Sequence, residues 1–257
     1  MCGRYASARS ADDLIAEFDV DELAIEEALP PDYNVAPTDP VHVVLERPAR
    51  PAAPERGLPE RKLPTRQLRV ARWGLVPSWA SDPKIGARMI NARVETVVQK
   101  PAFRTAAARR RCLVPADGYY EWYADEGTKR PHFLHRADGK GLAFAGLYEI
   151  WRDQKAADEA GGWMWSCSIV TTEATDDLGH VHDRMPMVVP TDRLATWLDT
   201  GLTDAARACE LLLPAGSEGL VTYPVAKDVG DVRNNGPHLI EPLRSTAADD
   251  DDVPMLF

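Results

Sequence analysis

The second residue of the chain is a cysteine, and glycine and arginine follow it directly in the stretch MCGRYA. A small residue after the initiator methionine allows that methionine to be trimmed, and Cys2 would then carry a thiol and a free α-amine on adjacent carbons. An α-amine has a reference pKa of about 7.7–8.0, so an appreciable fraction of it is nucleophilic near pH 7. Such a residue can condense with an aldehyde and close to a five-membered thiazolidine. Its thiolate can instead attack an acyl carbon, with the α-amine as base.

Further residues have side chains suited to proton transfer or anion binding. His182, in GHVHDRMPMVV, titrates near neutral pH, and Arg184 shares its side if the stretch is extended. Glu121 follows two tyrosines in VPADGYYEWY, where it either faces solvent or is buried with a raised pKa. In MINARVET, an extended backbone places the Asn91 amide and the Arg93 guanidinium on one side. Taken one at a time, such motifs are more commonly a surface turn or the solvated face of a strand than part of a site.

The elements that must position these residues are mostly short strands. Apolar residues at helical spacing predict one or two helices within 10–29, with Ser10 as N-cap, and short helices at 191–199 and 204–213. Many short strands with few helices favour a single α+β domain of mainly antiparallel sheet. Strands are expected within 41–47, 67–77, 109–123, 132–136, 141–151, 163–174 and 219–227.

Composition places the chain among ordinary globular proteins. It has 257 residues, of which 44% are hydrophobic and 27% charged. No apolar run approaches the ~18–20 residues of a membrane helix, and no signal-peptide layout is present. We therefore expect a cytoplasmic, nucleoid-associated protein that contacts no membrane. The cysteines form no CxxC pair, which argues against a zinc site and a disulfide framework, so we expect no metal or other cofactor. They are Cys2, Cys112, Cys167 and Cys209, and the middle two are expected in the core.

The charge is unevenly distributed. A net charge of −10, from 30 basic and 40 acidic residues, counts against a generic nucleic-acid binder. However, the segments 12–27 and 249–252 hold many of the acidic residues. A local basic groove is therefore compatible with the sequence. Arginines gather near Arg4, Arg88, Arg93, Arg104, Arg109 to Arg111 and Arg184.

The motifs together resemble one family. MCGRYA, YNVAPT, RWGLVPSW, INARVET, CLVPADGYYEW, HDRMPMVV and DVRNNGPHLI occur in this order from residue 1 to about residue 243. This is the pattern of the SRAP family, the SOS-response-associated peptidases, also described as abasic-site-processing proteins. The resemblance implies an α+β fold with antiparallel sheets around a groove for single-stranded DNA. It also implies a catalytic site of Cys2, Asn91, Glu121 and His182. Residues that match DNA-contacting positions are Arg4, Arg93 and Arg184 for phosphates, and Pro37 and Trp79 beside unstacked bases.

The chemistry implied by the resemblance fits Cys2. An abasic site presents an aldehyde in its ring-opened form, and an N-terminal cysteine can trap it as a DNA–protein crosslink. Glu121 would move protons, His182 would act as acid or base at the sugar oxygen, and Asn91 would orient Cys2 and the sugar. The alternatives are a thiol peptidase or autopeptidase, an N-terminal-nucleophile glutaminase that releases ammonia, and a DNA-binding module without chemistry. The balance among crosslinking, lyase and hydrolase activity stays open.

Two segments stand outside the family pattern. We expect a catalytic domain over 1–244 with a Pro-rich loop insertion at 48–66, a disordered acidic tail over 245–257, and a monomeric protein. The tail sequence DDDDVPMLF joins an acidic spacer to an apolar end, a pattern by which disordered segments dock into hydrophobic pockets. We predict that Leu256 and Phe257 contact a replication sliding clamp. Titration of a labelled 249–257 peptide against purified clamp should show binding that is lost when both residues are alanine. Equal binding by the two peptides would refute this contact.

Overall fold

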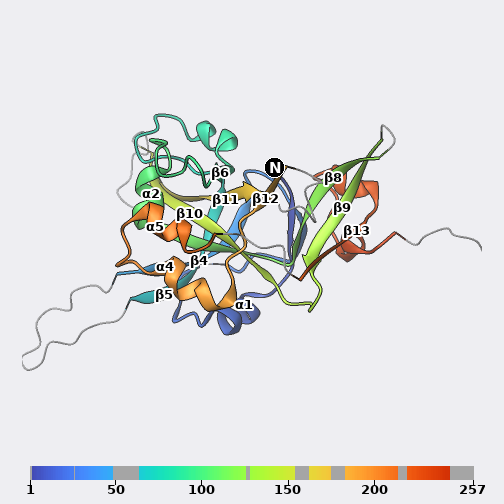
Figure 1. The fold of residues 1–257 in the computed structure, drawn as a ribbon, viewed down its shortest axis with the longest axis horizontal. Helices are drawn as coiled ribbons and strands as arrows, with labels where there is room; N and C mark the ends of the chain where they lie inside the picture. The colour runs from blue at the N-terminus through green and yellow to red at the C-terminus, as the bar shows by residue number, and fades with distance from the viewer. Residues whose placement is uncertain are drawn as a thin grey trace, which may run out of the picture.

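The computed structural model describes residues 2–25, 27–48, 64–125, 128–153, 162–174, 183–213 and 219–243. Within these ranges the predicted α+β class is confirmed, because short helices accompany two sheets of mainly antiparallel strands. Figure 1 shows β8, β9 and β13 on one side of the molecule and most other labelled strands and helices on the other. The first sheet has the order β13 (Leu220–Pro224), β9 (Thr128–Arg136), β8 (Gly118–Asp125), β1 (Tyr5–Ser7) and β3 (Asp32–Val35).

The second sheet closes on itself. The strand β11 pairs with β10 on one side and with β5 on the other, so β11, β10, β7, β4 and β5 form a ring. We call this ring the barrel. Its closure removes the free edges that an open sheet would leave unpaired. Short strands β12 and β6 add to β11, and β2 adds to β5. The bounds are β2 Glu22–Leu23, β4 Pro40–Arg47, β5 Thr65–Trp73, β6 Asn91–Arg93, β7 Arg111–Ala116, β10 Leu142–Arg152, β11 Trp163–Glu173 and β12 Arg184–Pro186.

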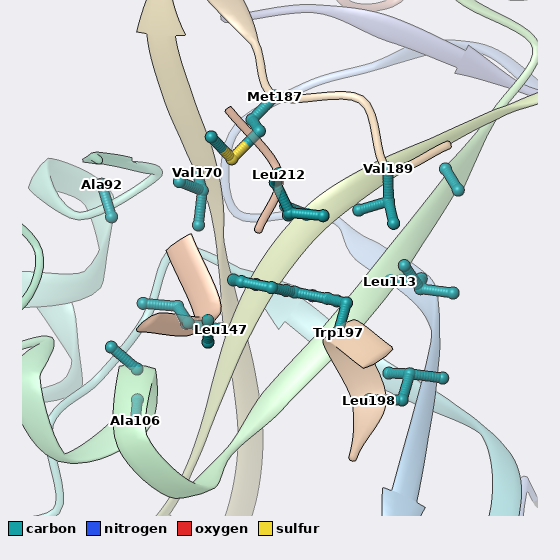
Figure 2. Close-up of a cluster of buried hydrophobic side chains, with 14 of the residues drawn as sticks. Ala92, Ala106, Leu113, Leu147, Val170, Met187, Val189, Trp197, Leu198 and Leu212 are labelled. Carbon is teal, nitrogen blue, oxygen red and sulfur yellow. The ribbon is translucent and has the colours of Figure 1, made fainter. Parts of the chain in front are cut away.

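The outer face of the barrel is covered by helices. The helices and the outward-facing side chains of the barrel strands form a hydrophobic core. Trp197 of α4 is buried at its centre, among side chains of the strands and of the segment after β12 (Figure 2). Its indole Nε1 donates to the Cys112 carbonyl over 2.8 Å, so the ring is fixed to β7 by a hydrogen bond as well as by packing. The helices are α1 (Ala11–Phe18), α2 (Arg104–Arg109), α4 (Leu194–Leu198) and α5 (Ala205–Glu210).

The inner face of the barrel is packed by the first sheet. Tyr5 of β1 makes edge contacts with Trp73 at 5.2 Å and with Phe144 at 5.9 Å between ring centroids. Tyr119 of β8 reaches the same Phe144 at 6.0 Å. The first sheet therefore closes one end of the barrel, and the beginning of the chain lies where the two sheets meet. As expected, Cys112 and Cys167 are buried core residues.

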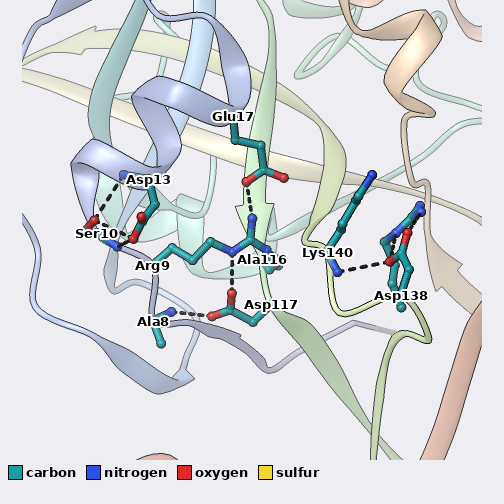
Figure 3. A network of polar contacts seen from close by, with 10 residues as sticks. Ala8, Arg9, Ser10, Asp13, Glu17, Ala116, Asp117, Asp138 and Lys140 are labelled. Atoms are coloured by element: carbon teal, nitrogen blue, oxygen red, sulfur yellow. Dashed lines mark hydrogen bonds and ion pairs between the residues drawn. The ribbon is translucent and has the colours of Figure 1, made fainter.

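A polar network holds the segment after β1 in place. Arg9 donates to Asp117 Oδ1 over 2.8 Å and also pairs with Glu17 of α1 (Figure 3). Asp117 Oδ2 accepts from the Ala8 amide over 2.6 Å. The network ties β1, α1 and the turn between β7 and β8 to one another, so the strand that leads from the chain start has neighbours on every side.

One helix, α1, forms within residues 10–29, where one or two were expected. Ser10 caps it in a capping box with Asp13, which confirms the predicted N-cap, and the helix ends at Phe18. Asp19 then adopts a left-handed backbone with φ 49°. Glu22 and Leu23 pair with β5, so strand pairing replaces a second helix.

Two sequence predictions fall largely outside the described residues. These are most of the Pro-rich insertion, whose last positions belong to β5, and the acidic tail with Leu256 and Phe257. In the part of the chain that the structure describes, no helix is long and apolar enough to cross a membrane.

A pair of glycines positions the segment that leads to β6. A Cβ atom on Gly86 would lie 2.4 Å from the Gly74 carbonyl oxygen, and one on Gly74 would lie 2.6 Å from the Gly86 oxygen. Gly74 also has φ +132°, which L-residues rarely adopt. Only glycine lets these two backbones touch.

We expect Gly86→Ala to lower the free energy of unfolding by roughly 1–3 kcal/mol, because the added methyl group forces two backbone segments apart. Urea denaturation measures this directly. Gly230→Ala is the matched control, since a Cβ there meets no atom within 4 Å, and it should change stability little. Equal midpoints for the two variants would show that the contact does not constrain the fold.

Candidate active site

Cys2 is buried although it lies at the start of the chain. Its exposed fraction is 0%. The backbone pairing of β1 with β8 continues toward the chain start, because Tyr120 N donates to the Arg4 carbonyl over 3.0 Å. Chain ends usually fray, but this one is held between two strands. The pairing brings Cys2 to the level of the barrel end that the first sheet closes.

Asn91 reaches Cys2 from the other sheet. It opens β6, which pairs in parallel with β11 through the register Asn91 to Ile169. Its Nδ2 donates to the Cys2 carbonyl oxygen over 2.7 Å. Its Oδ1 is buried and accepts no hydrogen bond from the described residues. The amide therefore fixes the Cys2 backbone and keeps one acceptor for another donor.

Glu121 is buried, so the less common of its two predicted environments is the one found. Its exposed fraction is 5%, and it alternates with Tyr120 so that it shares a face of β8 with Tyr119. Burial raises the pKa of the Glu121 carboxyl to about 6, and the nearby Asp183 carboxylate acts in the same direction. A group with this pKa exchanges protons near neutral pH.

Burial also acts on the thiol. It raises the pKa of Cys2 far above its ordinary value, and the charge of Glu121 adds to this effect, while a backbone hydrogen bond from Arg4 opposes it. The thiol is therefore protonated at neutral pH. This environment suits a thiol that adds to an electrophile while it loses its proton, and it does not suit a preformed thiolate.

His182 lies outside the described residues, so its predicted place beside Cys2 stays a prediction. The next residue, Asp183, is described, and its charge acts on Glu121. The segment that follows enters β12, as the turn-to-strand prediction for HDRMP required. No local pattern indicates the interaction between Asp183 and Glu121, because the two residues are far apart in the chain.

Comparison with known proteins agrees with the motifs. A model of the family described as SOS response associated peptidase (SRAP) matches residues 1–232. The chain belongs to the SRAP family. It is 35% identical over 242 residues to the abasic site processing protein YoqW of Bacillus subtilis, covering 94% of this chain and 99% of that protein. It is 31% identical over 255 residues to the abasic site processing protein YedK of Escherichia coli, covering 95% of this chain and 100% of that protein.

A solved structure shares the fold of this chain. A crystal structure of a protein from Bacteroides thetaiotaomicron covers 94% of this chain and 100% of its own, with a TM-score of 0.75 and 23% identity. At that identity the likeness concerns the fold alone.

Three of the predicted DNA-contacting residues of this SRAP chain are accessible. Arg93 is exposed at the end of β6, on the same side of the strand as Asn91. Trp79 is 62% exposed in the segment between the two facing glycines. Pro37 is half-buried in the turn between β3 and β4, next to Thr38 with its left-handed φ of 82°. Their contacts with DNA stay predictions.

The other two predicted phosphate ligands are bound within the protein. Arg184 is 7% exposed, and its guanidinium makes two hydrogen bonds to Glu95, of 2.8 and 3.0 Å, and one to the Thr171 carbonyl. Arg4 donates to Asn34 Oδ1 over 2.7 Å and to the Val229 carbonyl over 2.8 Å. A phosphate contact by either residue stays a prediction that requires these hydrogen bonds to be shared or exchanged.

The raised pKa of Glu121 predicts a pH dependence of stability. The folded protein keeps this proton up to about pH 6, whereas the unfolded chain releases it near 4.5, so stability falls as pH rises through that window. The difference of 1.5 units corresponds to about 2 kcal/mol. Glu121→Gln removes the titration, so its stability relative to the wild type should rise by about that amount between pH 4.5 and 7.

Urea denaturation across this range provides the measurement. Glu210→Gln, which changes a largely exposed carboxyl on α5, is the matched control and should run parallel to the wild type. A Glu121→Gln curve that also runs parallel to the wild type would mean that the carboxyl ionises as it does in water.

Proposed function

We propose that this SRAP chain binds single-stranded DNA containing abasic sites and captures the sugar aldehyde on Cys2 as a thiazolidine crosslink. The observation that carries the proposal is the meeting of Cys2 with Asn91 and Glu121, which brings a terminal nucleophile, a fixed amide and a proton-exchanging carboxyl together. The names of relatives that span nearly the whole chain, which describe them as abasic site processing proteins, support the substrate.

The steps balance without a cofactor. After Met1 is removed, the α-amine of Cys2 attacks the open-chain aldehyde, and loss of one water gives an imine. The Cys2 thiol then adds to the imine carbon, and its proton passes to the imine nitrogen. The products are a five-membered ring and one water molecule. The amine is the first nucleophile in this sequence, because the imine that it forms is the electrophile to which the thiol then adds.

The surrounding groups have distinct roles in the proposal. Glu121, with a pKa near 6, takes a proton from the amine and returns it to the departing water. The free Oδ1 of Asn91 accepts a hydrogen bond from the amine or the sugar, while its Nδ2 holds the Cys2 carbonyl. His182 assists at the sugar oxygen, and Arg93 binds a phosphate with Trp79 and Pro37 beside the bases.

A peptidase remains the alternative because the family description contains that activity. A thiol peptidase needs a thiolate or a base that produces one, and burial of Cys2 in an apolar site disfavours that form. The same argument applies to a glutaminase. The aldehyde route needs only a neutral amine and a thiol that loses its proton during ring closure.

We expect a heat-stable adduct on a denaturing gel when the protein, with removal of Met1 verified by intact mass, meets single-stranded DNA carrying one abasic site. Cys2→Ala should abolish the adduct, because neither the imine nor the aldehyde can close a ring without the thiol. Glu121→Gln should form it more slowly while binding DNA normally, because an amide keeps the shape but cannot exchange protons.

Cys209→Ala is the matched control. This cysteine is buried on α5, in the core between the helices and the outer face of the barrel, so the variant should form the adduct as the wild type does. An adduct formed by Cys2→Ala at the wild-type rate would overturn the proposal. Cleavage of peptides by the wild type but not by Cys2→Ala, without any DNA adduct, would favour the peptidase.

A further inference from the structure

A cluster of arginine and aromatic side chains occupies the barrel end opposite the one that the first sheet closes. On β4 and β5 these residues continue the inward-facing rows of Val43, Leu45 and Ala71 beyond the apolar core. The rows of β10 and β11 do the same, since Trp165 follows the alternation of Ile169 and Cys167. We name this group the far-mouth cluster and define it as Arg47, Arg69, Tyr148, Arg152, Trp163 and Trp165.

Aromatic rings hold the guanidinium groups of the far-mouth cluster. The Cζ atom of Arg69 lies 4.3 Å from the centre of the Trp165 ring, and that of Arg47 lies 5.8 Å from the same ring. Tyr148 stacks on Trp165 at 5.5 Å with an angle of 23° between the ring planes. Packing of this kind restricts long side chains before any ligand arrives, so less entropy is lost on binding.

The far-mouth cluster contains three arginines and no carboxylate. No ion pair among the described residues involves Arg47, Arg69 or Arg152. Burial lowers the pKa of Arg69, and the like charge of Arg47 acts in the same direction. Gln67 bridges Glu22 and Arg69, since it donates to Glu22 and accepts from Arg69, and the charge of Glu22 opposes the lowering of the Arg69 pKa. Like charges kept together in a protein of net charge −10 indicate that an anion belongs here.

The exposed aromatic ring of the far-mouth cluster favours an anion that also carries flat rings. Trp163 is 56% exposed, and the Cζ atom of Arg152 lies 5.4 Å from its ring centre on the neighbouring strand. An exposed indole beside arginines that form no ion pair with a described residue combines a stacking surface with phosphate ligands, which is the pattern of proteins that bind single strands. Trp165 is partly buried, and its ring orients Arg47 and Arg69 rather than offering a surface for stacking.

We propose that the far-mouth cluster is a second binding site for single-stranded DNA, with Arg47 and Arg69 on backbone phosphates and a base stacked on Trp163. This inference rests on the proposed function, because it assigns a path to the strand that flanks the abasic site. Along β11, Trp163 is six residues from Ile169, the register partner of Asn91, which is about 20 Å at 3.4 Å per residue. At about 3.4 Å per stacked nucleotide, a strand needs at least about six flanking nucleotides to reach both sites.

The test compares short and long strands. Wild-type protein should bind a long undamaged single strand more tightly, and with a steeper salt dependence, than a strand with about two nucleotides on either side of the centre. The double variant Arg47→Ala, Arg69→Ala should lose this gain and reduce the salt slope on the long strand by about 1.4, from 0.7 per phosphate contact. Trp163→Ala should weaken long-strand binding roughly fivefold or more through loss of stacking.

Controls separate charge from folding. Arg47→Lys with Arg69→Lys should keep the salt slope, and Arg207→Ala, an exposed arginine on α5 paired with Glu210, should behave as wild type. Trp163→Ala decides the question if the double alanine variant fails to fold, because its exposed ring contributes little to the core.

The outcome for this second site is distinguishable from that of the proposed function. Adduct formation on a short abasic strand reports on Cys2 alone and should be unaffected by every far-mouth variant. If folded far-mouth variants bind the long strand with wild-type affinity and slope while the short strand still forms its adduct, the second site is refuted and the proposed function stands. If the wild-type protein binds and crosslinks no single strand, the proposed function itself fails.

Discussion

The insertion of β1 between β3 and β8 is the interaction on which the site depends. A strand at the chain start would ordinarily fray, yet this one has a partner on each side, and Tyr5 within it packs against Trp73 and Phe144 of the barrel. The contacts of Arg9 with Asp117 and Glu17 secure the next residues. Together these contacts carry Cys2 into a completely buried position without any further element of its own.

Burial at the junction of the two sheets then sets the chemistry. The same loss of solvation raises the pKa of the Cys2 thiol and of the Glu121 carboxyl, so both groups hold protons more strongly than they would in water. The thiol therefore stays neutral, while the carboxyl titrates close to neutral pH. Asn91 adds a fixed hydrogen bond from the opposite sheet, so the site is shared between the barrel and the sheet that closes it. At the opposite end of the barrel, aromatic rings rather than carboxylates contact Arg47, Arg69 and Arg152 among the described residues.

Much of the fold could be predicted from the sequence, and the family resemblance named the candidate site residues, but the rest of the fold depends on long-range pairing. The Ser10 cap, the strand β4 and the extended stretch Asn91–Arg93 of INARVET follow local rules, and the structure agrees with each. The closure of β11 against β5 has no local signal, because it joins residues about as far apart as Trp73 and Cys167. Similarly, alternation in β8 allowed either face for Glu121, and the partner of Arg184, Glu95, lies 89 positions away. The family motifs place Cys2 and Asn91 in one site although 89 positions separate them, and the structure joins them by a hydrogen bond.

The attachment site of the DNA adduct tests the central claim most directly. Tandem mass spectrometry of a protease digest of the crosslinked protein would locate the modified residue and give its mass. The account predicts one modified peptide, starting at Cys2 without Met1, whose mass equals peptide plus abasic fragment less one water, with both the amine and the thiol blocked to alkylation. A modification on any other residue, or a Cys2 peptide whose thiol still reacts, would contradict the account.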